Sequence, residues 1–281
     1  MSVANNHIKV SKVQDNEGVV LVQLARPPVN AFHQSMWEEL GATFDRLSRD
    51  GQVRAIVLSS SNPKIWTAGL DLTATGALSS RDEDPARTSI PLRDHIIHFQ
   101  SCISAIERCR QPVLAAVHGA AIGLGVDILC ACDVRFASES ATFCIKEVDV
   151  GMAADIGTLS RFPKIVGNQS AARELAFTGR TFDANEAKEL GFVSKVVDGG
   201  MEEVLAATVH VARIISTKSP IAIMGSKHLL NHARDNSVGN SLEYTATWNS
   251  LMLQANDTTD AFAAFKGKNP PVFKPIPSSK L

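Results

Sequence analysis

An almost entirely apolar run of twenty residues, Val113 to Cys132, constrains the fold of this chain more than any other feature. It reads VLAAVHGAAIGLGVDILCAC. Its length would suit a bilayer, but His118, Asp127 and three glycines interrupt it. An acid is costly at the centre of a membrane, whereas glycines and polar groups are natural where a buried strand turns into a helix. We therefore expect a strand followed by a buried helix and reject a membrane span.

The remaining pattern alternates between strands and helices for about two thirds of the chain. Apolar runs of strand length and segments of helical spacing follow one another, which is typical of an α/β core. Strands are expected at 18–26, 53–61, 112–119, 134–138 and 141–145, and helices at 32–50, 91–110, 123–133, 157–167 and 168–179. Segment 181–197 is expected to be a helix that Gly191 ends, followed by a strand.

The last third of the chain is predicted to be helical, and its final residues are not. Helices are expected at 200–217, 219–232, 238–254 and 257–266, before a tail that contains four prolines in NPPVFKPIPSSKL. We divide the chain into a core at 1–199, a helical region at 200–268 and an extended tail at 269–281. The polar segment Thr73 to Ser89 is predicted to be a flexible loop and a candidate lid.

Composition and motifs exclude several function classes. The net charge of −1 gives no electrostatic case for binding nucleic acid or an anionic membrane. Five cysteines, an odd number without a Cys-x-x-Cys pair, are expected to be reduced core thiols. The glycine spacing differs from the dinucleotide fingerprint, no Walker lysine follows it, and there is no Gly-x-Ser-x-Gly elbow. No spacing of His, Cys and Asp indicates a metal site.

Two glycine-containing turns are candidates for a site that binds an anion or a developing negative charge. They read IWTAGLDL, from Ile65, and HGAAIGLGVD, from His118. Glycine allows a sharp turn that leaves backbone N–H groups free, and a helix N-terminus presents unpaired N–H groups. Each turn is also compatible with an ordinary junction between a strand and a helix. His118 itself is expected to be a structural residue.

Three acids stand beside apolar sequence and are candidates for proton transfer. Asp127 lies in GLGVDILC, and Glu147 and Asp155 lie in KEVDVGMAAD. Carboxyl groups that share a buried pocket push one another's pKa values apart and can exchange protons with a substrate. The spacing alone leaves a second interpretation open, in which Asp127 bonds a turn and the other two are loop acids.

Taken together, these stretches resemble the crotonase (enoyl-CoA hydratase/isomerase) superfamily over about Val19 to Lys266. The resemblance rests on RPPVNAF at 26–32, AGLDL at 68–72, PVLAAVHGAAIGLGVDILCACDVRFAS at 112–138, GTLSRFPKIVG at 157–167 and TGRTFDANEAKELGFVSKVV at 178–197. It implies an α/β spiral of ββα units whose C-terminal helices, here those after Gly200, form homotrimers that often pair into homohexamers.

Within the superfamily, the chain is most similar to the dienoyl-CoA isomerase family, because Asp127, Glu147 and Asp155 match its three acids. The resemblance implies an enzyme of fatty-acid β-oxidation that converts 3,5-dienoyl-CoA to 2,4-dienoyl-CoA by moving protons between C2 and C6. Enoyl-CoA hydratase and 3-to-2 enoyl-CoA isomerase remain alternatives of the same fold. A non-catalytic CoA- or RNA-binding protein is the alternative of another class.

The resemblance also implies the binding groups. The backbone N–H groups of Leu70 and Leu124 would form an oxyanion hole, although the family usually has glycine in place of Leu124. The thioester and CoA would lie along Ala68, Gly69, Leu70, Asp71 and Leu72. No cofactor or metal is implied, because CoA is part of the substrate.

The chain ends in Ser279-Lys280-Leu281. This tripeptide is an address that the peroxisomal import receptor reads at a free C-terminus. We therefore expect a peroxisomal location.

Overall fold

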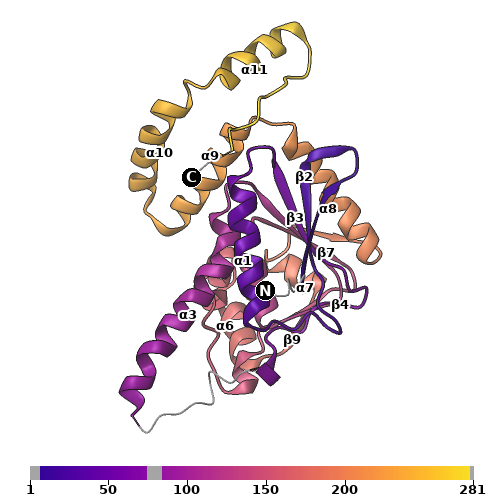
Figure 1. Cartoon of the computed structure of the whole chain (residues 1–281), viewed down its shortest axis with the longest axis vertical. Helices are drawn as coiled ribbons and strands as arrows, with labels where there is room; N and C mark the ends of the chain where they lie inside the picture. Colours follow the sequence, from indigo (N-terminus) through magenta and orange to yellow (C-terminus); the bar gives the residue numbers. More distant parts are fainter. Residues whose placement is uncertain (1–6, 75–83, 279–281) are drawn as a thin grey trace, which may run out of the picture.

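The computed structural model describes residues 7–74 and 84–278 (Figure 1). The strands are β1 (Ile8–Val13), β2 (Asn16–Leu24), β3 (Ala55–Ser60), β4 (Ile65–Thr67), β5 (Val113–Val117), β6 (Ala120–Ile122), β7 (Val134–Ser138), β8 (Thr142–Cys144), β9 (Thr181–Asp183) and β10 (Lys195–Val197). The helices are α1 (Gln34–Arg49), α3 (Pro85–Arg108), α4 (Leu124–Ala131), α5 (Thr158–Ile165), α6 (Gln169–Thr178), α7 (Ala184–Glu189), α8 (Met201–Ser216), α9 (Pro220–Asp235), α10 (Val238–Met252) and α11 (Asn256–Gly267), with 3₁₀ turns η1 (Leu72–Ala74) and η2 (Glu147–Val150).

Two sheets organise the core. The larger has the order β1-β2-β3-β5-β7-β10, and the smaller has the order β4-β6-β8-β9. The pairs β3–β4, β5–β6 and β7–β8 each place their first strand in the larger sheet and their second in the smaller one, and a helix follows each pair. Neighbouring strands pair in parallel, except β1 with β2 and β8 with β9. The predicted α/β spiral of ββα units is therefore confirmed.

The central strands β3 and β5 of the larger sheet are buried on both faces, which explains their continuous apolar sequences. In β3, Ile56 and Leu58 belong to the main hydrophobic core, whereas Val57 belongs to a second core on the opposite face. Helix α8 covers that second face with Val204 and Ala212. The last third of the chain thus begins with a helix that is packed onto the sheet.

The other face carries α1 and α3, which pack against each other. The apolar face of α1 is buried, and its N-terminal cap is His33, whose side chain accepts a hydrogen bond from the Met36 N–H. Trp37 of α1 stacks on Phe99 of α3 with ring centroids 4.4 Å apart. Helix α4 is buried over its whole length, as the apolar run that contains it predicts. No helix in the described ranges is both long and apolar enough to cross a membrane.

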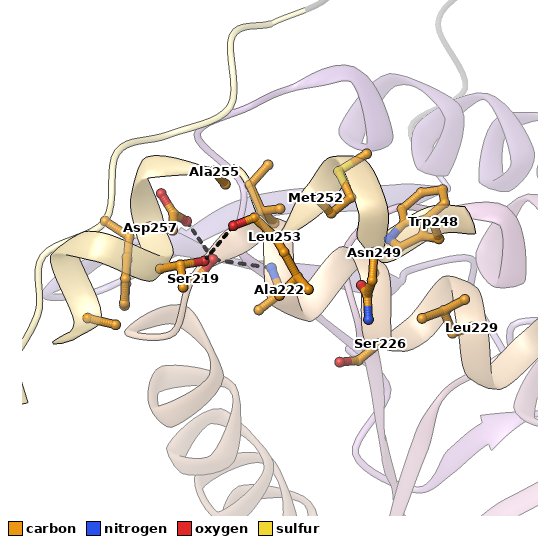
Figure 2. A pocket seen from close by; sticks show the side chains of 15 residues that line it. Ser219, Ala222, Ser226, Leu229, Trp248, Asn249, Met252, Leu253, Ala255 and Asp257 are labelled. Atoms are coloured by element: carbon orange, nitrogen blue, oxygen red, sulfur yellow. Dashed lines mark hydrogen bonds between the residues drawn. The ribbon is translucent and has the colours of Figure 1, made fainter. Parts of the chain in front are cut away.

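Helices α9, α10 and α11 extend away from the two sheets as an arm (Figure 1). A pocket of about 350 Å³ lies between them, and Figure 2 shows Ser219, Asp257 and Trp248 around it. Ser219 donates a 2.5 Å hydrogen bond to Asp257, which links the start of α9 to the start of α11. The chain then returns to the core, where Arg54 donates to the carbonyl of Phe273 at 2.8 Å.

Two of the secondary-structure predictions are wrong. Helix α3 begins at Pro85 and not at residue 91, because the Asp84 side chain accepts hydrogen bonds from two N–H groups of its first turn. Part of the predicted loop at Thr73–Ser89 is thus helical, and residues 75–83 lie outside the described ranges. Segment Thr181–Asp183 is strand β9, because it pairs with β8 instead of joining the helix after it. The pattern also did not predict β1, β4 or β6.

A buried ion pair attaches the arm to the core, and we predict that it is important for stability. The Lys227 ammonium, on α9, lies 2.7 Å from the Asp133 carboxylate and donates to the carbonyls of Ile106 and Gln111. Lys227→Met should lower the free energy of unfolding by about 3 kcal/mol, because the Asp133 carboxylate loses its counter-charge. Urea denaturation measures the change.

Lys164→Met is the matched control, because Lys164 forms an exposed pair with Asp235. Its effect should stay below about 1 kcal/mol. Equal losses in the two variants would contradict the prediction.

Candidate active site

A pocket of about 380 Å³ opens where the parallel strands of the smaller sheet end. It is lined by segment 68–72 after β4, by the last residue of β6 with the two residues after it (122–124), and by Glu147 after β8. The carboxyl ends of parallel strands meet at one edge of a sheet, which is where α/β proteins bind their ligands. The pocket therefore lies where the topology favours a site.

All three candidate acids line this pocket, and each comes from a different element. Asp127 lies in the first turn of α4, Glu147 opens η2, and Asp155 lies in the loop before α5. Residues up to 28 positions apart in the sequence are thus brought to one cavity.

Asp127 is the most deeply buried of the three acids. It is 1% exposed, and it accepts a 2.6 Å hydrogen bond from the Thr158 N–H at the start of α5. Burial raises the pKa of Asp127 to about 6, while the bond from Thr158 and the positive charge of Arg161 oppose that rise. The carboxylate is therefore held in place by the N-terminus of a helix, which favours its charged form.

Glu147 also has a raised pKa. Burial and the negative charge of Asp127 raise the pKa of Glu147 to about 7. Its Oε2 atom is buried and has no hydrogen-bond partner among the described residues. If Gly123 carried a side chain, its Cβ atom would lie 3.4 Å from Oε1 of Glu147. The carboxyl group of Glu147 therefore lies beside the turn that starts α4. A carboxyl group in this state gains and releases a proton near neutral pH.

Asp155 occupies another part of the pocket wall. Burial raises the pKa of Asp155, while its own N–H and the charge of His95 oppose that rise. The Asp155 carbonyl accepts a 2.6 Å hydrogen bond from the side chain of Gln100 on α3. Helix α3 therefore holds this loop in place.

The Leu70 N–H points away from the segment at Phe32, with which Leu70 pairs. Leu70 forms a parallel bridge with Phe32, in which the Phe32 N–H donates to Gly69 O and the Asp71 N–H donates to Phe32 O, both at 2.8 Å. In such a bridge, the central residue's own N–H faces the opposite side. This N–H is thus left free of the pairing with Phe32.

Leu124 supplies the second N–H. It is the first residue of α4, so its N–H has no carbonyl partner within the helix. A Cβ atom at Gly69 would lie 3.5 Å from the Leu124 nitrogen and only 2.6 Å from Ile122 O. Gly69, which has φ +86°, therefore lets the two backbone segments approach closely. Two backbone donors beside a pocket suit a developing oxyanion.

The remaining predicted binding residues, Ala68, Asp71 and Leu72, also line the pocket. Ala68 donates its N–H to Val29 O at 3.0 Å. The Asp71 carboxylate binds Arg26 at 2.9 Å and accepts hydrogen bonds from Thr73. The Asp71 side chain thus already has protein partners.

Sequence reasoning did not identify the opposite wall of the pocket. It is formed by α1 and α3 through Trp37, His95, Ile96 and Phe99. A signal was present, because residues 92, 96 and 99 recur at helical spacing, but that pattern predicts only a buried face. His118, in contrast, contacts the Asn62 carbonyl at 2.7 Å, as expected for a structural histidine.

The described residues contain no group of three or more His, Cys, Asp or Glu side chains that is placed to hold a metal ion. The chemistry that the side chains and backbone themselves offer is proton transfer beside a stabilised negative charge. Two N–H groups favour an oxyanion, and acids with raised pKa values exchange protons nearby.

Three comparisons relate this chain to known proteins. The enoyl-CoA hydratase/isomerase family profile matches residues 14–275. A human protein named mitochondrial Delta(3,5)-Delta(2,4)-dienoyl-CoA isomerase is 45% identical over 92% of this chain and 78% of its own length. An Arabidopsis thaliana protein of that name, designated peroxisomal, is 40% identical over 95% of this chain and 96% of its own. The crystal structure of an enoyl-CoA hydratase from Bacillus anthracis is 26% identical, with a TM-score of 0.85 over 96% of this chain and 99% of that one.

Proposed function

This chain belongs to the enoyl-CoA hydratase/isomerase family, and on that premise we propose that it is an isomerase that converts 3,5-dienoyl-CoA to 2,4-dienoyl-CoA in fatty-acid β-oxidation. The resemblance predicted from the sequence is confirmed by the family match and by the identity to proteins named dienoyl-CoA isomerase. The observation that carries the proposal is that Asp127, Glu147 and Asp155 line one pocket.

The reaction begins with loss of a proton from C2. The C–H electrons move into an enolate whose charge is shared by the thioester oxygen, C2, C4 and C6. The Leu70 and Leu124 N–H groups stabilise the charge on oxygen, and one such donor contributes roughly 3 kcal/mol to the transition state. Protonation at C6 then shifts both double bonds into conjugation with the carbonyl. One turnover leaves the base protonated and the acid ionised, so proton exchange with water restores both groups before the next turnover.

We infer the roles of the acids from their positions in the pocket. The Glu147 carboxyl group lies beside Gly123, next to the Leu124 N–H that would hold the thioester oxygen. It therefore takes the proton from C2, the carbon next to that carbonyl. Asp155, which lines another part of the same pocket, gives a proton to C6. Asp127 raises the proton affinity of Glu147 by charge repulsion.

The pocket also bears on the alternatives. A hydratase must activate water between its acids, whereas a third acid in the pocket, Asp155, suits a proton delivered at C6. A non-catalytic CoA- or RNA-binding protein does not require buried acids with raised pKa values. Ionised carboxylates would also repel the phosphates of such a ligand. The proposed reaction needs no cofactor, since CoA is part of the substrate.

The first prediction concerns Asp155. Wild-type protein should convert 3,5-octadienoyl-CoA to the 2,4-isomer, seen as a rise in conjugated-diene absorbance and identified by mass spectrometry and NMR. Asp155→Asn should lower kcat at least about a hundredfold, because the acid at C6 is lost. Unchanged turnover would remove Asp155 from the mechanism, and faster hydration of crotonyl-CoA than isomerisation would favour the hydratase.

The second prediction concerns pH. The proposed base Glu147 must be ionised, so kcat/KM should rise as pH passes through its pKa of about 7. Asp127→Asn removes a neighbouring negative charge and keeps an acceptor for the Thr158 N–H. The pKa of Glu147 should therefore fall, and the rising limb of the pH profile should move to lower pH. Stopped-flow measurement of kcat/KM at a series of pH values around neutrality locates the rising limb in each variant.

Asp149→Asn is the control for that profile. Asp149 lies on the same 3₁₀ turn, but its side chain is 44% exposed and paired with Lys146. Its removal should leave the rising limb where it is. A limb that stays in place or moves to higher pH in Asp127→Asn would show that Asp127 does not raise the pKa of Glu147.

The helical arm supports a homotrimer or a homohexamer. Helices α10 and α11 have no buried residues, and they expose large apolar side chains such as Leu242, Leu251, Phe262 and Phe265. Apolar faces of this kind mark contact surfaces between proteins. The division into a core at 1–199, a helical region at 200–268 and a tail at 269–281 stays a proposal, with α8 packed on the core sheet.

We predict that Phe265→Asp, at a side chain that is 83% exposed, weakens assembly because the charge would be buried at a subunit contact. Sedimentation velocity should show smaller species than for the wild type. Phe177→Asp is the matched control, because Phe177 is 72% exposed on α6 of the core. Equal dissociation of both variants, or of neither, would contradict this role of the arm.

A peroxisomal location is proposed from Ser279-Lys280-Leu281, which lies outside the described residues. A relative named peroxisomal supports it, whereas another is named mitochondrial. A fluorescent fusion that ends at Ser278 should lose a peroxisomal distribution that the full chain shows.

A further inference from the structure

We propose that Arg26, supported by Asn30 and Thr67, positions the Leu70 N–H for catalysis by clamping together the two backbone segments between which that N–H is set. The inference rests on the proposed function, because it takes the Leu70 N–H as an oxyanion donor. Neither Arg26 nor Asn30 lines the pocket. They are therefore positioning residues and not catalytic ones.

The direction of the Leu70 N–H depends on the segment at Phe32. The bridge from Phe32 to Gly69 and Asp71 consists of two hydrogen bonds, one on each side of Leu70. A rotation of residues 69–71 about this bridge would change the direction of the Leu70 N–H relative to the Leu124 N–H. The geometry of the oxyanion hole thus requires that the bridge be held from outside the pocket.

Arg26 holds the bridge by its two sides. Its Nη1 donates to Ala31 O at 2.6 Å, and its Nη2 lies 2.9 Å from the Asp71 carboxylate. Ala31 precedes Phe32, and Asp71 follows Leu70, so one planar guanidinium fixes the separation of the two segments. The Arg26 side chain is 22% exposed and that of Asp71 is 13% exposed, so water screens the attraction between their charges less than at an exposed pair. A lysine presents a single ammonium point charge and not such a fork.

Asn30 joins the same segments on the buried side. It is 1% exposed and has a left-handed backbone with φ +52°. Its Nδ2 donates to Ser60 Oγ at 2.8 Å and to Trp66 O at 2.9 Å, and its Oδ1 accepts from the Arg26 N–H at 2.8 Å. These bonds connect the ends of β2, β3 and β4.

Thr67 completes the connection to the turn. Its hydroxyl donates to Asn30 O at 2.6 Å and accepts from the Gly69 N–H at 3.0 Å. Thr67 thereby fixes the Ala68–Gly69 peptide, and the Phe32 N–H holds the carbonyl of the next peptide, whose N–H is that of Leu70. The arrangement also gives the Asp71 carboxylate a structural role. It binds Arg26 and Thr73 and so helps to hold the two backbone segments together.

The first test is Arg26→Lys, which keeps the positive charge and removes the fork. We expect kcat to fall about tenfold, short of the roughly hundredfold or greater cost of losing a donor outright. KM should stay within about twofold, because the interaction belongs to the transition state. Arg180→Lys is the matched control: Arg180 forms an exposed fork with Glu174 and Glu186 on α6 and α7, and its replacement should leave kcat unchanged.

Thr67→Val is the second variant, and it breaks the connection with little change of shape. Both variants are examined with bound 2,4-dienoyl-CoA, whose absorption moves to longer wavelength when N–H donors polarise its carbonyl. The wild type and Arg180→Lys should show the full shift. Arg26→Lys and Thr67→Val should show a smaller one, with saturation confirming that the ligand is bound.

A full wild-type shift in Arg26→Lys and Thr67→Val overturns the inference, even if their thermal stability falls. A loss confined to KM also overturns it. The proposed function fails separately: a wild type that shifts the absorption of 2,4-dienoyl-CoA but does not isomerise the 3,5-compound loses its proposed reaction. In that case, a reduced shift in both variants still supports the clamp.

Discussion

The close approach of two backbone segments, at Gly69 and at Leu124, is the contact on which the rest of the site depends. A side chain at Gly69 would meet Ile122 O at 2.6 Å, so only glycine lets the turn after β4 reach the turn after β6. Helix α4 begins at that contact and carries Asp127 one turn later. One local contact thus sets the direction of an N–H donor and the depth of an acid.

The ββα spiral explains why the parts meet. Each of three successive strand pairs adds one strand to each sheet, so the ends of β4, β6 and β8 lie side by side in the smaller sheet. The segments that follow these strands supply the Leu70 amide, the Leu124 amide with Asp127, and Glu147. The larger sheet, whose central strands β3 and β5 are buried on both faces, gives these ends a rigid base.

Burial gives the acids their chemistry at a cost in stability. It raises the pKa of Asp127 to about 6 and that of Glu147 to about 7, and Glu147 keeps a buried oxygen without a partner in the described structure. A pKa that is higher in the folded than in the unfolded chain means that ionisation disfavours folding as pH rises through that range. The Thr158 N–H and the Arg161 charge limit this cost at Asp127. Such a loss of stability from buried acids is typical of functional sites.

Local sequence determined most of the long strands and most helices, because apolar periodicity, caps and glycine turns act over a few residues, whereas the choice of the three acids rested on the family resemblance. Only the tertiary structure decided the short strands β4, β6 and β9, since three residues carry no period and form a strand only when a neighbour pairs with them. It also decided that Asp155 faces a wall made by α3 and that Arg26 reaches Asp71, 45 positions away in the chain. Such contacts depend on where the spiral brings distant segments, which no local pattern encodes.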